Sequence, residues 1–275
     1  MSLPATDTGA RLSALRLVSF IPQARDAVHV GLLTPDAQQV VDLTHLGITD
    51  ALDAFERLSM LRQTAGAIVH GAARTSFAVS EVHLVAPIPL VRCVVRVTDT
   101  TALHFADPAT LHGPGGHLGR VEAAEAQVGL AAVVGETIEA TRSCSDDQLD
   151  VALSGSVLVI GWPQAGPDGA PMLQPGAVGP FVAVPRRRPE SLMLTAVAPL
   201  DVHGTPDVKH TLVAPSDAEF LSLAREALRT HTLRPGDLLT IFPGQSLVPQ
   251  GTVIAGGSWI RATAPGLGTL SLAVR

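Results

Sequence analysis

The sequence predicts a β-rich α+β fold, and three observations lead to that prediction. Short apolar stretches recur along the 275 residues, and turn-forming residues separate them, since the chain contains 25 glycines and 21 prolines. Only a few segments have the periodicity and capping residues of helices. Hydrophobic residues make up 46% of the chain and charged residues 16%, which favours a sizeable core. Many short strands with few helices are typical of a coiled or barrel-like sheet.

The N-terminal part of the chain is expected to begin with strands and to continue with helices. Thr49 is the expected N-cap of a helix that carries Leu52, Phe55 and Leu58 on one face. A second helical segment is expected over residues 60–73. Alternating apolar residues predict the three preceding strands, which are Leu15–Ile21, Val28–Leu33 and Gln39–Leu43.

The remainder of the chain is expected to be mostly strands, with two further helices. Capping boxes, Ser145 with Gln148 and Ser216 with Glu219, predict where these two helices begin. Apolar and β-branched runs predict the strands. They are Val91–Val97, Val128–Val134, Ser156–Ile160, Val178–Val184, Leu192–Val197, Leu238–Phe242, Gly251–Ala255, Trp259–Ala264 and Thr269–Val274.

Composition and charge exclude several functional classes. The formal net charge of −6 argues against nucleic acid as a partner, and the basic run Pro185–Pro189 is interpreted as a solvated loop. No apolar stretch is long enough for a membrane helix, and no signal peptide is recognisable, so we expect no membrane partner and a cytoplasmic location. Cys93 and Cys144 lack metal-site spacing and are expected to be buried free thiols.

The segment Phe105–Gly135 combines a Phe-x-Asp-Pro element, a Gly-Pro-Gly turn and an apolar strand that ends in glycine. Its order and spacing resemble the central block of the fumarylacetoacetate hydrolase (FAH) family. Further pieces also resemble the family, and they are His83–Leu90, Val178–Phe181, Leu233–Thr240 and Pro265–Leu270. The resemblance implies a small N-terminal α/β domain at 12–83, after a leader at 1–11. It implies an FAH-like C-terminal domain with a coiled mixed or barrel-like sheet at 84–275, and dimerisation.

The resemblance also implies where a divalent metal would lie, but the residues there differ. The family's two metal-binding glutamates correspond to Gln127 and Gly129, and hard Mg²⁺ or Mn²⁺ needs clustered anionic oxygens. Glu122 and Glu125 stand just upstream and could form a shifted site. Solvated glutamates before a strand are the alternative interpretation. We therefore expect no cofactor and a site that works without metal.

Candidate acid–base groups lie just before the turn. The family's catalytic histidine corresponds to a position near Thr101, whereas His104 and Asp107 follow it three and six residues later. These two could act as a base and its orienting carboxylate, or form a polar loop that binds a ligand. His112 and His117 flank the Gly-Pro-Gly turn and could line the same cavity or be exposed.

Besides Thr101 and Gln127, four further residues are expected to contact substrate because they correspond to the family's substrate loops or lie beside the metal position. In place of the family's Thr-Gly-Thr-Pro the chain has Thr240 and Phe242, so an apolar ring replaces a hydroxyl. His203 stands in a His-Gly turn, and Trp162 follows the run that corresponds to the family's metal-binding aspartate.

Two hypotheses follow for the function. The first is a metal-independent enzyme that isomerises, cyclises or cleaves a small or polyketide-like oxo-acid or diketone, in a pocket of few polar groups. The second is a binding protein or silent subunit that pairs with an active paralogue. A homodimer or a heterodimer with such a paralogue is expected in either case.

Overall fold

The computed structural model describes most of the chain. The described residues are 15–23, 26–71, 75–88, 92–97, 100–105, 111–118, 126–140, 144–165, 171–186, 188–197, 208–243, 257 and 259–274. Among them, no helix combines the length and apolarity needed to cross a bilayer.

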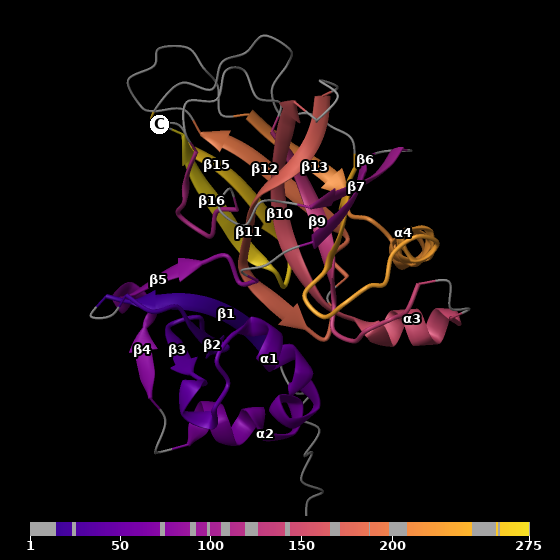
Figure 1. Ribbon diagram of the computed structural model, residues 1–275. Helices are drawn as coiled ribbons and strands as arrows, with labels where there is room; N and C mark the ends of the chain where they lie inside the picture. Colours follow the sequence, from indigo (N-terminus) through magenta and orange to yellow (C-terminus); the bar gives the residue numbers. More distant parts are fainter. Residues whose placement is uncertain are drawn as a thin grey trace, which may run out of the picture.

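A sheet of eleven strands forms the centre of the fold (Figure 1). Ten strands follow one another in the order β4-β3-β2-β1-β11-β10-β9-β14-β6-β7, and β5 pairs separately with β1. In chain order the strands are β1 (Leu15–Pro22), β2 (His29–Leu33), β3 (Gln39–Asp42), β4 (Ser76–Ala78), β5 (Val82–Val85), β6 (Arg92–Val97), β7 (Thr100–Phe105), β9 (Gln127–Val134), β10 (Leu153–Ala165), β11 (Pro171–Val184) and β14 (Leu238–Phe242).

A second sheet of five strands packs on one face of the first. Its order is β13-β12-β15-β16-β8. These strands are β8 (His117–Leu118), β12 (Ser191–Val197), β13 (Val208–Val213), β15 (Trp259–Ala264) and β16 (Gly268–Val274). The α+β, strand-rich prediction is confirmed. The barrel-like alternative is wrong, because in the described residues β4 and β7 remain as the two open ends of the long sheet.

Strand β9 shows why the core forms on both faces of the long sheet. Val128, Leu130 and the other even-numbered residues face one apolar cluster, shared with the five-stranded sheet and helix α4 (Asp217–Leu228). Ala131 and Val133 face a second cluster on the opposite side, shared with helix α1 (Ala51–Glu56). A strand covered on both faces has a continuous apolar sequence, which is why this strand could be predicted.

Within the described ranges there are four α-helices, and two of them pack into each of the two apolar clusters (Figure 1). The capping boxes of Ser145 and Ser216 are confirmed, and each serine accepts from the backbone N–H of the third helical residue. The first helix is capped by Asp50 rather than by the expected Thr49; Asp50 Oδ1 accepts from the N–H of Asp53 at 2.9 Å. The helices are α1 (Ala51–Glu56), α2 (Leu58–His70), α3 (Asp146–Ala152) and α4 (Asp217–Leu228), with short 3-10 turns at Thr44–Leu46 and Val79–Glu81.

The basic run was interpreted as a solvated loop, and its first arginine contradicts that interpretation. The Arg186 side chain is only 6% exposed and forms ion pairs with Asp150 at the α3 helix and Asp217 at the α4 helix. Its guanidinium carbon also lies 5.7 Å from the centre of the Phe220 ring. Arg188 pairs with the same two carboxylates from a more exposed position. The pairs hold the two helices against the end of β11.

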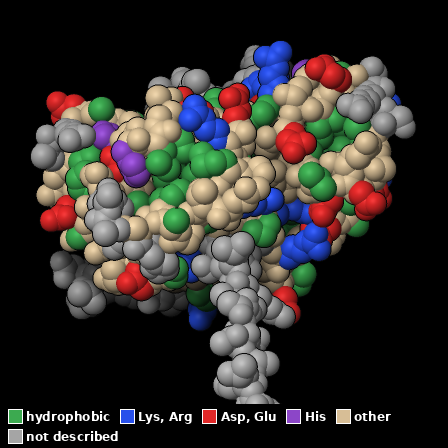
Figure 2. Space-filling view, turned by 90° about the horizontal axis from the view of Figure 1, so that it is seen from below, with side chains coloured by type: hydrophobic (Ala, Val, Ile, Leu, Met, Phe, Trp, Pro, Cys, Tyr) green, Lys and Arg blue, Asp and Glu red, His purple; other side chains and the backbone are tan. Residues whose placement is uncertain are grey.

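Charged side chains of both signs are mixed on the surface. Figure 2 shows basic side chains beside acidic ones on the face seen from below, with apolar and uncharged polar groups between them. Proteins that bind nucleic acid usually gather their basic side chains into one patch or stripe. On this face, the described residues do not form such a patch.

Candidate functional site

The ends of several neighbouring strands of the long sheet lie side by side where β9 begins. Gln127, the first residue of β9, is in register with Gly161 of β10. Phe242, the last residue of β14, is in register with Val97, the last residue of β6. Val97 in turn pairs with Thr100, the first residue of β7. Because β14 runs antiparallel to β9, these strand ends share one edge. We call this edge the Gln127 end of the sheet.

The amide of Gln127 is the unusual polar group of this edge. Its Oε1 atom is buried and has no hydrogen-bond partner among the described residues. A buried amide oxygen without a partner costs about 1–3 kcal/mol, so native proteins rarely leave one unpaired. Such an atom is satisfied when a donor from a ligand, a water or a cation reaches it.

Phe242 occupies the space next to Gly129, two residues further along β9. A β-carbon added at Gly129 would lie 2.8 Å from Cδ1 and from Cε1 of the Phe242 ring, and 3.0 Å from the carbonyl oxygen of Ile241. The ring is fully buried. Position 129, which the resemblance aligns with a metal-binding glutamate, therefore has no room for a side chain while Phe242 is present.

Thr240 lies under this edge and contributes to the core, not to an open surface. It is fully buried, and its Oγ1 atom lies 3.1 Å from the Sγ atom of Cys93. Burial, more than any other cause, raises the pKa of Cys93 to about 12. The thiol is therefore inert at neutral pH, because the thiolate is the reactive form. Cys144 is only partly buried, so the expectation of two buried thiols is confirmed for Cys93 alone.

His104 lies at the opposite end of the sheet from Gln127. Its backbone pairs with Cys93, which is in register with Leu238. Leu238 in turn pairs with Val133, six residues beyond Gln127 on β9. At 3.2–3.4 Å per residue, six residues span about 20 Å. The structure therefore does not bring the backbone of His104 to the Gln127 end. Thr101, in contrast, pairs with Arg96, next to the pair of Val97 and Thr100 that lies at the Gln127 end.

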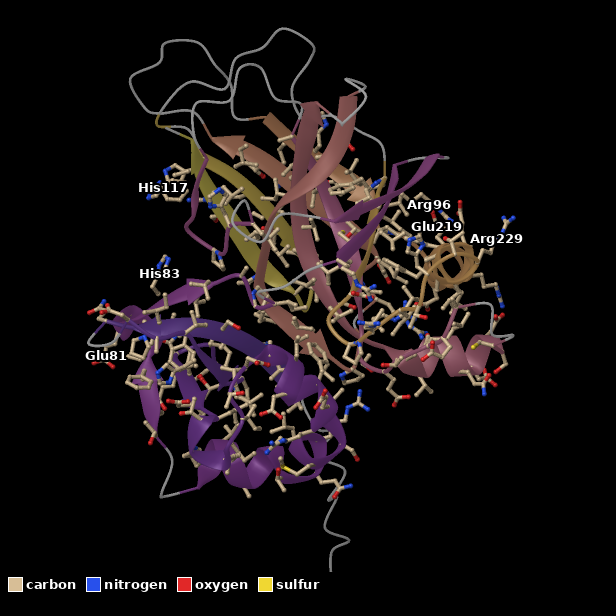
Figure 3. All side chains as sticks on the ribbon, viewed as in Figure 1. Glu81, His83, Arg96, His117, Glu219 and Arg229 are labelled. Atoms are coloured by element: carbon tan, nitrogen blue, oxygen red, sulfur yellow. The ribbon has the colours of Figure 1, made fainter. Side chains whose placement is uncertain are left out.

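His112 and His117 are brought together by the Gly-Pro-Gly turn. Burial, and to a lesser extent the charge of His117, lowers the pKa of His112. The turn is anchored on β16, because Gly115 N–H donates to the carbonyl of Ser271 at 2.8 Å. His117 is exposed, and Figure 3 shows it on the side of the molecule opposite Arg96, the residue that pairs with Thr101. His117 therefore lies away from that strand pair, whereas the backbone of His112 bridges Ala177, which is in register with Ile160 and through it with Val128, the residue after Gln127.

The remaining candidates can be placed only in part. The structure describes the backbone of Trp162, which pairs with Gln174 of β11. Trp162 follows Gly161, the residue of β10 that is in register with Gln127. The other four candidates lie outside the described residues, and they are Asp107, Glu122, Glu125 and His203.

A buried His–Asp pair was not predicted from the sequence. His29 Nδ1 lies 2.9 Å from Asp42 Oδ2, and both side chains are almost fully buried. Asp42 Oδ1 also accepts from the backbone N–H and the hydroxyl of Thr44. The pair joins β2 to the end of β3, which is a structural role. The two residues are 13 positions apart, so no local pattern signals their contact.

Comparisons with known proteins identify the fold. No family model matches the sequence, and no curated protein matches it. Among solved structures, maleylpyruvate hydrolase from Sphingobium sp. SYK-6 is similar at 18% identity, with a TM-score of 0.69 and coverage of 94% of this chain and 98% of that one. A fumarylacetoacetate hydrolase from Exiguobacterium antarcticum is similar at 15% identity, with a TM-score of 0.67 and coverage of 95% and 99%. A 2-hydroxyhepta-2,4-diene-1,7-dioate isomerase from Mycobacterium marinum is similar at 19% identity, with a TM-score of 0.61 and coverage of 94% and 98%. The chain has the FAH fold.

The same comparison corrects the expectation that no cofactor is involved. The Sphingobium hydrolase was also solved in complex with manganese(II) and pyruvate, and this complex resembles the chain with a TM-score of 0.66. The described residues fit a cation only in part. Gln127 Oε1 is one suitable oxygen, position 129 offers none, and no group of three acidic, histidine or cysteine ligands occurs within the described residues. Divalent cations of this kind are ordinarily held by several oxygens.

Proposed function

We propose that this chain, which has the FAH fold, is an enzyme that hydrolyses or isomerises a small 2-oxo acid at the Gln127 end of the sheet. The fold supports the general class, because hydrolases and isomerases of such acids share it. The choice of site rests on the Oε1 atom of Gln127, which is buried and has no hydrogen-bond partner among the described residues. An enzyme site needs such a group held ready for a ligand.

Gln127 is proposed to select the enol form of the substrate. A 2-oxo acid in its keto form has no donor at the carbonyl, whereas its enol has a hydroxyl that can donate to Oε1. An amide oxygen that is already desolvated loses nothing further when this hydrogen bond forms, so the enol is favoured. The Phe242 ring, buried beside Gly129, gives the apolar wall that excludes water from the same edge.

A divalent cation is part of the proposal. When bound, it would polarise the carbonyl oxygen of the oxo acid. Gln127 Oε1 is the described atom that could contact the cation or one of its waters. Glu122 and Glu125 are the carboxylates nearest to it in the sequence.

The test combines binding and turnover in the presence of Mn²⁺. Calorimetry in the presence of Mn²⁺ should show binding of pyruvate and of lactate, whose 2-hydroxyl can donate as an enol hydroxyl does. Gln127→Ala should weaken lactate binding about tenfold, equivalent to one lost hydrogen bond of about 1.4 kcal/mol, and should leave pyruvate binding unchanged. Gln38→Ala, in an exposed turn, is the matched control and should bind as the natural protein does. Turnover of maleylpyruvate and of 2-hydroxyhepta-2,4-diene-1,7-dioate would be followed by ultraviolet absorbance.

Each result distinguishes the alternatives. Binding without turnover of either compound would favour the second hypothesis, a binding protein or a silent subunit of a paralogue. Equal lactate affinity for the natural protein and Gln127→Ala would refute the assignment of the site.

A further inference from the structure

A cavity lies away from the Gln127 end. It has a volume of about 640 Å³ and lies where β1 and the β2–β3 turn meet the outer face of the five-stranded sheet. Phe181 of β11 forms part of its wall and lies between Gly179 and Ala183, which are in register with Leu158 and Ser156 of β10 and through them with Leu130 and Ala132 of β9. Those residues are three and five positions from Gln127, about 10–17 Å along the strand, and β11 is two strands away from β9, so the cavity and the proposed active site are separate. Six of the lining residues are Arg16, Phe181, Met193, Thr211, Thr263 and Thr269.

Arg16 gives this cavity a positive charge. Its guanidinium carbon lies 5.3 Å from the centre of the Phe181 ring, and its Nη1 atom donates to the carbonyl of Pro35 at 3.2 Å. These two contacts fix the direction of the side chain. Within the described part of the chain, no carboxylate lies at ion-pair distance from Arg16, in contrast to Arg186. The remaining guanidinium donors can therefore receive an anion.

The other walls are hydroxyl groups and apolar side chains. Thr263 and Thr269 face each other across β15 and β16 with their Oγ1 atoms 3.1 Å apart, so one hydroxyl can still donate outward. Met193 and Phe181 supply apolar surface. A cavity of a few hundred Å³ with mostly apolar walls and a few convergent polar groups is typical of a site for a small organic molecule. The planar donor fork of arginine matches a carboxylate.

We propose that this cavity, which we call the Arg16 pocket, binds a small organic carboxylate with an apolar body. The carboxylate contacts the Arg16 guanidinium and the threonine hydroxyls, and the apolar body packs against Phe181 and Met193. The proposal does not depend on the function proposed for the Gln127 end. The competing occupant is the segment before Arg16 in this chain, which contains Asp7.

Calorimetry and ligand-observed NMR with phenylacetate test the proposal, and phenylacetamide serves as the uncharged counterpart. Phenylacetate should bind at least about tenfold more tightly than the amide, since a charge-assisted pair contributes about twice as much as a neutral hydrogen bond. Arg16→Gln should remove that preference. Arg62→Gln, an exposed arginine of α2, and Gln127→Ala should leave phenylacetate binding unchanged.

A second variant tests the cavity without changing charge. Met193→Trp fills the pocket and should abolish binding while Arg16 remains, and circular dichroism would confirm that it is folded. Equal binding of acid and amide, unchanged binding in Arg16→Gln, or absence of binding to the natural protein would overturn the proposal. Stronger phenylacetate binding in Asp7→Asn would assign the pocket to the chain's own N-terminal segment and would also overturn it.

Discussion

The contact between Gly129 and Phe242 leads to a quantitative prediction about stability. In Gly129→Ala the new methyl group would lie 2.8 Å from two ring carbons and 3.0 Å from a backbone oxygen, all in a fully buried region. Because the ring cannot leave the core, the methyl group should overpack it. We expect a loss of about 1–3 kcal/mol in the free energy of unfolding.

A double-mutant cycle separates this clash from other effects of the alanine. Phe242→Val removes both ring atoms that the methyl group meets, and alone it should cost about 2 kcal/mol through the cavity that it leaves. In the double variant the methyl group introduced at position 129 would fill part of that cavity. The combined loss should therefore be smaller than the sum of the single losses by about 1 kcal/mol or more.

The measurement is equilibrium unfolding in urea, with the free energy extrapolated to zero denaturant. Gly66→Ala is the matched control, because Gly66 is exposed on α2 and a β-carbon there would meet nothing within 4 Å. It should stabilise the protein by about 0.5–1 kcal/mol, since alanine is the better helix former. Additive losses at positions 129 and 242, or a Gly129→Ala variant as stable as the natural protein, would refute the reasoning.

Three further predictions concern other parts of the fold. Gly113→Ala should destabilise the protein by about 1–3 kcal/mol in urea unfolding, because its β-carbon would lie 2.3 Å from the backbone of Val85; an unchanged midpoint would contradict this. Burial lowers the pKa of His112, so the unfolded chain takes up the proton more readily, and stability should fall as the pH drops below about 6.5. His112→Gln should reduce that loss between about pH 7.5 and 5.5, and an identical pH dependence would refute it. Iodoacetamide at about pH 8 should label Cys144 in the folded protein and leave Cys93 unlabelled until urea is added.

Local sequence patterns predicted most helices and strands, because the interactions that start a helix or bury a strand involve residues close together in the sequence. The serine caps at 145 and 216 depend on a residue three positions later, and β9 depends on a continuous apolar run. Strands such as Ser76–Ala78 and Thr100–Phe105 were missed because their pairing partners, β3 and β6, decide their conformation. Propensity in such short strands is weaker than the pairing context.

For the candidate site, the sequence indicated the residue Gln127 but not the surroundings of its side chain. The resemblance drew attention to Gln127, and the structure adds that its oxygen is buried without a partner among the residues described. The distance between His104 and Gln127 depends on the register of four neighbouring strands, which no local pattern reveals. The ion pairs that the buried Arg186 forms likewise need two helices that are distant in the sequence.

The position of β1 in the long sheet has a consequence for how the protein is made. Leu15 pairs with Val184, so this early strand reaches one of its partners only after 169 further residues (184 − 15) have been synthesised. Until then, among the described strands, only β2 and β5 can pair with β1, and the edge that β11 will occupy stays open. Contacts this distant in sequence slow folding, and exposed strand edges favour association between chains. The emerging chain should therefore depend on chaperones most strongly before β11 leaves the ribosome.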